Sequence, residues 1–174
     1  IELGAALGAH RVAPPPASLK EAWFAAVDPL TAAPEESNEL PTDQHVIGAV
    51  QRAAHRDTIV MCAAGTMPGE LHKLWKAPRP GAYHMEYGYS CMGYEIPGAM
   101  GVKMAMPDRD VICMIGDGSY LMANSELATA AMMGVAYTLV VTDNRGFGCI
   151  NRLQKATGGA EFNNLFAHTV HQEM

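Results

Sequence analysis

The segment 116-GDGSYLMANSELATAAMMGVAYTLVVTDN-144 places polar residues just after each of two apolar runs. The first run, VICMI at 111–115, directly precedes the segment, and the second, YTLVV at 137–141, lies near its end. The residues between the runs have the composition of a helix, so strand, helix and strand predict a βαβ unit with parallel strands. Asp117 and Asn144 follow the two strands, and we therefore expect them side by side at one edge of the sheet.

The rest of the chain continues this alternation. We expect helices over 43–56, 67–75, 95–106 and 125–134, strands over 57–65, 111–116 and 135–144, and a loop followed by a helix over 146–159. The Gly- and Tyr-rich segment 79–94 is expected to be irregular. The pattern predicts an α/β fold, a doubly wound parallel sheet with helices on both faces. The turns at Gly65, 116–118 and 146–148 then fall at the carboxyl ends of the strands, where ligands bind in such sheets.

The N-terminal residues differ in composition from the rest. Residues 1–41 combine a run of three prolines at 14–16, a short helical pattern over 18–27 and a Pro- and Glu-containing stretch up to Pro41. We interpret residues 1–41 as a linker or arm from a preceding domain, and residues 42–174 as one ligand-binding domain. Because the sequence has no initiator Met and ends without a terminating feature, we expect a piece of a longer protein, truncated at its C-terminus.

Composition excludes several functional classes. Of the 174 residues, 49% are hydrophobic and 17% are charged, which is typical of a globular domain with a large core. The net charge of −6 and the scattered Lys and Arg residues argue against nucleic-acid binding. No apolar run approaches the roughly 20 residues needed to span a membrane. The four cysteines form no CxxC pair, and the N-terminus does not have the pattern of a signal peptide, so we expect a cytoplasmic protein.

The polar residues after the strands indicate a cation site. Side-chain oxygens of Asp117 and Asn144 suit Mg²⁺ or Ca²⁺ better than Zn²⁺. One carboxylate is too little charge to hold Mg²⁺ firmly, so the site makes sense if the ligand brings anionic oxygens, as magnesium-diphosphate does. Gly116 and Gly118 allow close approach of the backbone, and N–H groups there and the Ser119 hydroxyl are placed to hold phosphate oxygens.

An ordinary tight turn with a solvated Asp remains the alternative for GDG alone. The spacing is more specific, because GDG is followed by 24 residues, 119–142, and then by Asp143-Asn144. The phosphate loop GxxxxGK[ST], the dinucleotide fingerprint GxGxxG after a strand, and HExxH are all missing from the sequence.

This spacing resembles the signature of the thiamine diphosphate-dependent enzymes, which is GDG, some two dozen residues and then NN, with Asp143 here in place of the first Asn. The resemblance implies that Mg²⁺ is bound by the side chains of Asp117 and Asn144 and by the backbone carbonyl of Gly146. It also implies thiamine diphosphate as the cofactor, with its diphosphate in contact with Gly118, Ser119 and Asn144, and with Gly146 also among the cofactor-binding residues.

Two upstream segments extend the resemblance. YGYSCMGYEIPGAMG at 87–101 is similar to the family segment G-x-[GS]-x-MG-[FY]. By this match Met92 holds thiamine in its bent form and the Ser90 carbonyl receives the 4′-amino group. AAGTMPG at 63–69 stands in the place of the first diphosphate loop, which implies a cofactor contact for Gly65 and Thr66.

A narrower resemblance covers about residues 40–165. AAGTMPGELHKLWKA, YHMEYGYSCMGYEIPGAMGVKMA, GDGSYLMANSE and DNRGFGCINRLQKATGG together resemble the 3D-(3,5/4)-trihydroxycyclohexane-1,2-dione hydrolases of myo-inositol catabolism. That resemblance implies hydrolytic C–C bond cleavage, opening the ring of a cyclic diketone to 5-deoxy-glucuronate. His84, Glu86 and Asn151 flank the cofactor segments and are candidates for facing this substrate, although a structural role is the simpler interpretation of each.

The resemblance also implies a part that these residues do not contain. In the superfamily, a glutamate on an N-terminal aminopyrimidine-binding domain, usually of a partner subunit, activates the cofactor. We therefore expect no catalytic residue within this fragment, an inactive fragment when alone, and a homodimer or homotetramer as the complete enzyme. Two alternatives stay open: an acetolactate synthase-like or 2-oxo acid decarboxylase-type enzyme, and a non-catalytic module for magnesium-diphosphate binding or subunit association.

Overall fold

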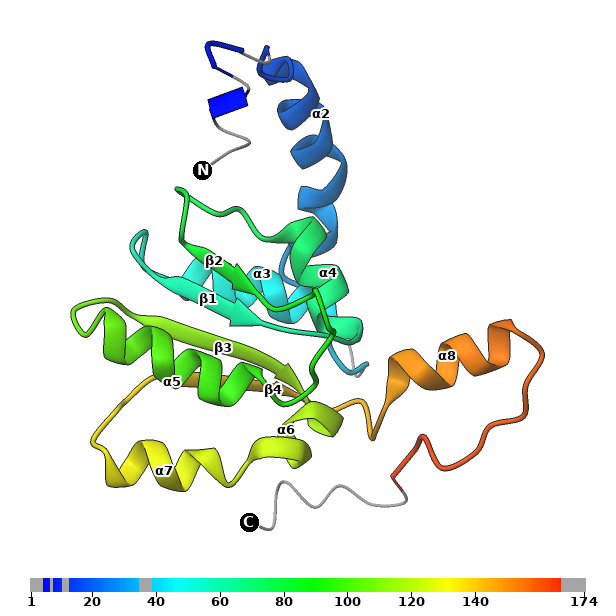
Figure 1. The fold of residues 1–174 in the computed structure, drawn as a ribbon. Coiled ribbons are helices and arrows are strands. Elements are labelled where there is room, and N and C mark those ends of the chain that lie inside the picture. Colours follow the sequence, from blue (N-terminus) through cyan, green and yellow to red (C-terminus); the bar gives the residue numbers. More distant parts are fainter. Residues whose placement is uncertain (1–4, 7, 11–12, 35–38, 167–174) are drawn as a thin grey trace.

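The computed structural model describes residues 5–6, 8–10, 13–34 and 39–166. Its centre is a four-stranded parallel sheet with the strand order β2-β1-β3-β4 (Figure 1). The strands are β1 (Ile59–Cys62), β2 (Tyr83–Met85), β3 (Val111–Gly116) and β4 (Thr138–Thr142). In the register, Ile59 of β1 lies opposite Val111 of β3, and Gly116 of β3 lies opposite Thr142 of β4. The last pairing brings the two polar segments after β3 and β4 to the same edge of the sheet.

Helices cover both faces of this sheet. One face carries α3 (Asp43–Ala53) and α4 (Thr66–Leu74), together with α2 (Ala17–Val27) and the 3-10 turn η1 (Asp28–Thr31). The other face carries α5 (Glu95–Ala105), α6 (Asp117–Ala123) and α7 (Glu126–Met132). Helix α8 (Gly148–Ala156) follows β4 and projects beyond the carboxyl edge of the sheet (Figure 1). The predicted α/β, doubly wound architecture is confirmed.

The side-chain alternation of β1 creates two cores. Val60 and Cys62 point to the face of α3 and α4, where they pack with the fully buried Ile47 and Leu71. Ile59 and Met61 point to the opposite face. There they pack with buried residues of α5 and β3, namely Ile96, Ala99, Val111, Cys113 and Ile115. Because both faces of the sheet are covered, the sequence of β1 is apolar at every position and does not alternate between apolar and polar residues.

Four elements depart from the predictions. β2 lies within the segment 79–94 that was expected to be irregular, as a three-residue edge strand paired only with β1. Its sequence YHM is too short and too polar to be recognised, because an edge strand is only half-buried. Helix α6 begins at Asp117 itself, so the polar turn after β3 is at once the first turn of a helix. The predicted strands 57–65 and 135–144 are shortened at both ends.

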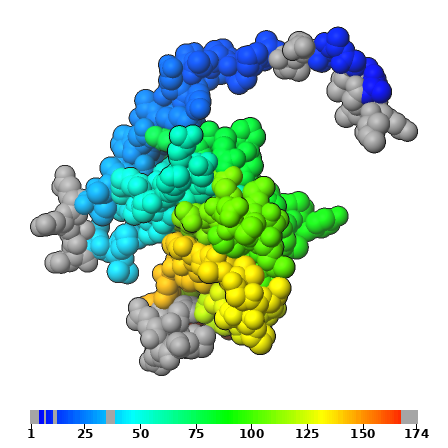
Figure 2. All heavy atoms as spheres, turned by 90° about the vertical axis from the view of Figure 1, so that its left-hand side faces the viewer, coloured from blue at the N-terminus to red at the C-terminus, as the bar shows by residue number. Residues whose placement is uncertain are grey.

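The N-terminal segment contacts the sheet domain through its helix. Val27 at the end of α2 is buried in the core, and the Trp23 indole N–H donates to the carbonyl of Lys73 at 3.0 Å. Arg52 donates to the carbonyl of Thr31 at 2.7 Å, joining α3 to η1. The first half of α2 extends outward from the rest of the molecule (Figure 2). Within the described ranges, no helix is long and apolar enough to cross a membrane.

Candidate functional site

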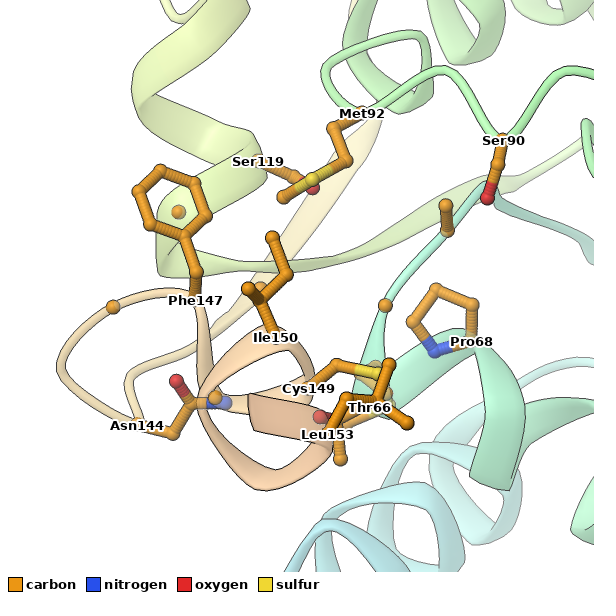
Figure 3. Close-up of a pocket in the computed structure, with 17 residues that line it drawn as sticks. Thr66, Pro68, Ser90, Met92, Ser119, Asn144, Phe147, Cys149, Ile150 and Leu153 are labelled. Carbon is orange, nitrogen blue, oxygen red and sulfur yellow. The ribbon is translucent and has the colours of Figure 1, made fainter. Parts of the chain in front are cut away.

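A cavity of about 260 Å³ lies at the carboxyl edge of the sheet, between the loop after β1, the start of α6 and helix α8 (Figure 3). It is lined by Ala64, Gly65, Thr66, Met67, Pro68, Ser90, Met92, Gly116, Gly118, Ser119, Asn144, Gly146, Phe147, Gly148, Cys149, Ile150 and Leu153. All eight residues that the sequence predicted for cofactor contact are in this set. They come from four separate segments of the chain, which the parallel topology brings together.

The buried carboxylate of Asp117 anchors one side of the site. Asp117 is 0% exposed, and its Oδ2 accepts a hydrogen bond of 2.6 Å from the backbone N–H of Gly146. Burial raises the pKa of Asp117, while the N–H groups of Gly146 and Gly118 lower it and the nearby Asp143 raises it further. The side chain does not itself line the cavity. It stands just behind the wall formed by Gly116, Gly118 and Gly146.

The Asn144 amide completes a small cluster of oxygens. One terminal atom of this amide lies 3.3 Å from Oδ1 of Asp117 and 2.9 Å from the carbonyl oxygen of Gly146. With the amide nitrogen in this place, Asn144 donates a hydrogen bond to both acceptors. With the amide oxygen there, three oxygens converge. Neighbouring oxygens around octahedral Mg²⁺ at 2.0–2.1 Å are roughly 3 Å apart. With the amide oxygen in this place, the two distances from Asn144 to Asp117 Oδ1 and to the Gly146 carbonyl are therefore compatible with this cation.

The predicted cation ligands do not form a cluster of acidic side chains. Within the described residues there is no group of three or more His, Cys, Asp or Glu side chains that could hold a metal ion. One carboxylate, one amide and one carbonyl leave a cation largely uncompensated, so a bound ion needs anionic oxygens from its ligand. The chemistry of the donors thus agrees with magnesium-diphosphate and disfavours a free-standing structural metal.

Two glycines of the site are fixed by packing. A Cβ at Gly118 would lie 2.8 Å from the Phe147 ring, and one at Gly146 would lie 2.3 Å from the carbonyl oxygen of Asn164. Gly146 also has φ +134°, a left-handed conformation that favours glycine. The backbone contact and the positive φ therefore require glycine at 146, whereas a side chain at 118 would have to displace the Phe147 ring.

The loop before Met92 is held in an unusual conformation. Ser90 has φ +57°, which is uncommon for a residue with a side chain. The Glu86 carboxylate accepts hydrogen bonds from the N–H groups of the residues on either side of Ser90, namely Tyr89 (2.9 Å) and Cys91 (2.8 Å). These bonds lower the pKa of Glu86. Glu86 thereby fixes the turn that presents Ser90 to the cavity.

The three candidates for facing a substrate lie elsewhere. None of His84, Glu86 and Asn151 lines the cavity. The His84 ring stacks on Tyr94, with Nε2 3.3 Å from the phenol oxygen. Asn151 donates to the Glu161 carboxylate at 3.3 Å. These contacts are compatible with the structural role that is the simpler interpretation of each residue.

Helix α8 supplies a wall of the cavity that the sequence reasoning missed. Cys149, Ile150 and Leu153 line the cavity from this helix, and Arg152 donates to the Thr66 hydroxyl at 2.7 Å. Ile150 is 47% exposed and Leu153 is 61% exposed, although both are apolar. The sequence does indicate a helix shortly after the Asp143-Asn144 pair. Because α8 begins four residues after Asn144, its first turn lies beside the predicted ligands, and this position could have identified it as a wall of the cavity.

Comparisons with known proteins agree with this geometry. The family model of the thiamine pyrophosphate enzyme C-terminal TPP-binding domain matches residues 63–172. Among curated relatives, a protein of Clostridium tetani is 46% identical over 134 residues, which are 77% of this chain and 21% of that protein. Proteins of Bacillus anthracis and Shouchella clausii are each 46% identical, over 73% and 71% of this chain.

All three relatives are named 3D-(3,5/4)-trihydroxycyclohexane-1,2-dione hydrolase. The chain spans about a fifth of the length of the curated relatives it matches. The family match covers the cavity-lining residues from Ala64 to Leu153. The chain belongs to the family of C-terminal thiamine pyrophosphate-binding domains of thiamine pyrophosphate enzymes.

Proposed function

We propose that this chain provides the magnesium-diphosphate half of the cofactor site in a thiamine diphosphate-dependent hydrolase. The proposed reaction is the opening of the ring of 3D-trihydroxycyclohexane-1,2-dione to 5-deoxy-glucuronate in myo-inositol catabolism. The observation that carries the proposal is the convergence of Asp117, Asn144 and Gly146 beside a cavity lined by all the residues predicted to touch the cofactor. The names of the relatives support the choice of substrate.

The residues of this chain have distinct proposed roles. Asp117, Asn144 and the carbonyl of Gly146 would hold Mg²⁺, and the Gly118 N–H and Ser119 hydroxyl would donate to diphosphate oxygens. Gly65 and Thr66 would contact the same diphosphate from the loop after β1. When bound, thiamine diphosphate supplies a carbon nucleophile and an electron sink for cleavage of a C–C bond.

Two further residues would orient the organic part of the cofactor. The Met92 side chain lies over the cavity, next to Ser119 (Figure 3). We assign it the task of supporting the bent conformation, because a thioether fills an irregular space without polar demands. The Ser90 carbonyl, held by the Glu86 turn, would accept a hydrogen bond from the aminopyrimidine.

The activating acid would come from outside this chain. Glu86 uses both carboxylate oxygens for backbone N–H groups, and Glu70 pairs with Lys73 at 2.9 Å on α4. Neither carboxylate lines the cavity. We propose that an aminopyrimidine-binding domain of a partner subunit supplies the glutamate, in a homodimer or homotetramer. The relatives, about five times as long as the matched segment, have room for such a domain.

The proposal is tested in two steps. Calorimetry of the chain with thiamine diphosphate should show binding that depends on Mg²⁺ and is lost in Asp117→Ala. The complete polypeptide should then open the cyclic dione, and this chain alone should not. Turnover of pyruvate but not of the dione would reject the proposed substrate in favour of a synthase- or decarboxylase-type enzyme. Binding that survives Asp117→Ala unchanged would reject the metal site.

A further inference from the structure

A carboxyl group without an assigned role lies behind the cavity. Glu95, the first residue of α5, is 0% exposed. Its Oε2 accepts a hydrogen bond of 2.8 Å from the Gly93 N–H, while its Oε1 is buried and accepts no hydrogen bond of regular geometry within the described part of the chain. Burying an ionised carboxylate with an unpaired oxygen is costly, so apolar packing alone does not account for a glutamate here.

The position of Glu95 connects two walls of the cavity. Gly93, its hydrogen-bond donor, directly follows Met92 and has φ +93°. A Cβ at Gly93 would lie 3.1 Å from the Met122 Cβ and 3.6 Å from the Ser119 carbonyl oxygen, so α6 packs tightly against this glycine. Glu95 therefore stands where the Met92 segment meets the helix that carries Ser119.

The Glu95 carboxyl changes its ionisation near neutral pH. Burial raises its pKa to about 7. The backbone N–H groups of Glu95 itself, Gly93 and Ala64, and the side chain of Ser119, oppose this rise because they stabilise the carboxylate. Ser119 is 2% exposed and lines the cavity, and its side chain lies close enough to the Glu95 carboxyl to lower the pKa of that group.

The other ionisable neighbours of Glu95 stay neutral. Cys62 on β1 and Cys113 on β3 both interact electrostatically with it. Burial raises the pKa of each thiol, to about 11 for Cys62 and further for Cys113. From α6 the interacting group is the uncharged Ser119 hydroxyl. The charge on Glu95 is therefore not set by these thiols in the neutral pH range.

We propose that Glu95 is a positioning residue that sets the direction of the Ser119 hydroxyl, and thereby couples its own protonation to binding of the diphosphate. This inference rests on the proposed function, which places Ser119 on a diphosphate oxygen. A hydroxyl has a single hydrogen to donate. Ionised Glu95 is an acceptor only, so it draws the Ser119 hydrogen toward itself and leaves oxygen lone pairs facing the anion.

Protonation reverses this arrangement. A protonated Glu95 donates its own hydrogen to Ser119 Oγ, and the Ser119 hydroxyl is then free to donate to an anionic oxygen in the cavity. Binding of the diphosphate is thus accompanied by uptake of one proton from solvent on Glu95. Below the pKa of Glu95 the proton is already present, and above it each pH unit weakens binding by up to about tenfold.

The experiment measures the Kd of thiamine diphosphate at saturating Mg²⁺ between pH 6 and pH 9, in wild type, Glu95→Gln and Ser119→Ala. A glutamine permanently offers an N–H to Ser119, so Glu95→Gln should bind with a flatter pH dependence and more tightly than wild type at pH 9. Ser119→Ala should bind thiamine diphosphate more weakly than wild type. Its Kd should also lose the part of the pH dependence that is missing in Glu95→Gln. Calorimetry in buffers of different ionisation enthalpy should show proton uptake in wild type that is absent in Glu95→Gln.

Titration of the ligand itself is common to all variants and cancels in the comparison. Glu21→Gln, an exposed carboxyl on α2, is the matched control and should keep the wild-type slope. Equal slopes in wild type and Glu95→Gln, with binding intact, would overturn this inference and leave the proposed function standing. If Glu95→Gln does not fold, an unchanged slope in Ser119→Ala overturns it equally. No binding by wild type at any pH overturns both.

Discussion

The backbone N–H of Gly146 donates a hydrogen bond of 2.6 Å to the carboxylate of Asp117, across 29 residues of sequence. This bond joins the start of α6 to the loop after β4, the two segments that carry the predicted cation ligands. It uses one carboxylate oxygen and leaves Oδ1 beside the Asn144 amide. Asp117 therefore has a task in the structure of the loop in addition to its proposed task at the cation.

Asp117→Asn should separate these two tasks. An asparagine retains an oxygen that can accept from Gly146, but it removes the one negative charge among the ligands. We expect the fold to survive and Mg²⁺-dependent binding of thiamine diphosphate to weaken at least as much as when a metal site loses an outer-shell partner, about 10–100-fold. Calorimetry with titrated Mg²⁺ measures this change.

The matched control for this charge removal is Asp108→Asn, in the exposed turn between α5 and β3. It changes the net charge of the chain equally and should leave the Mg²⁺ dependence intact. Comparable weakening in both variants would mean that the long-range charge of the protein, and not coordination by Asp117, governs binding.

Gly146→Ala is expected to be strongly destabilising. The new Cβ would lie 2.3 Å from a backbone carbonyl oxygen of Asn164, and alanine would have to adopt φ +134°. Backbone strain of this kind costs about 1–3 kcal/mol, and the contact adds to it. Urea denaturation followed by circular dichroism measures the free energy of unfolding.

Gly101→Ala provides the opposite expectation for the same chemical change. Gly101 lies within α5, and a Cβ there meets no atom within 4 Å. An added methyl group should raise the free energy of unfolding by roughly 0.5–1 kcal/mol, because alanine loses less conformational entropy in a helix. Equal effects of the two substitutions would contradict the packing described around Gly146.

The architecture was predictable because strands of a parallel sheet that is covered on both faces appear in the sequence as continuous apolar runs. Residues 111–116 were expected as a strand and form β3 with the same limits. The Asp117–Asn144 relationship was predictable for the same reason, since parallel neighbours must end at one edge. Edge strand β2 was not predictable, because pairing on one side permits a short and polar sequence.

The supporting groups of the site were harder to find in the sequence. Glu95 sits in an apolar helix, and only its tertiary surroundings show that it is fully buried beside Ser119. Likewise, the role of Glu86 depends on the fold of the next five residues back onto its carboxylate. Helical or strand periodicity carries no information on such contacts, whereas the GDG spacing points directly to the predicted ligands.

Glu86→Ala should loosen the turn that presents Ser90. Both carboxylate oxygens accept backbone hydrogen bonds on this turn, from Tyr89 and Cys91, and alanine offers none. We expect faster amide hydrogen exchange at these two residues and unchanged exchange in β1 and β3. NMR or mass spectrometry of exchange in D₂O measures the effect.

Glu86→Gln is the graded comparison, because one amide oxygen remains to accept from one of the two N–H groups. Its exchange rates should fall between those of wild type and Glu86→Ala. Glu21→Ala removes an exposed carboxylate on α2 and should leave the exchange at both residues at wild-type rates. Slow exchange in Glu86→Ala would show that the turn is held by other contacts.

Glu95 should also make the stability of the protein depend on pH. Burial raises the pKa of its carboxyl from 4.5 to about 7, so between these values the folded protein binds more protons than the unfolded chain. Folding stability must then fall as pH rises through this window, and the loss is complete above the folded-state pKa. The difference in pKa corresponds to about 3 kcal/mol at most.

Glu95→Gln removes this titration and keeps an oxygen for the Gly93 N–H. Urea denaturation of both proteins at pH 5, 6, 7 and 8 should show wild type losing stability relative to the variant as pH rises. Asp43 and Asp117, whose pKa values burial also raises, titrate in both proteins and cancel in the difference. Parallel stability curves would mean that Glu95 stays ionised in the folded state, and its coupling to Ser119 would then have no proton to transfer.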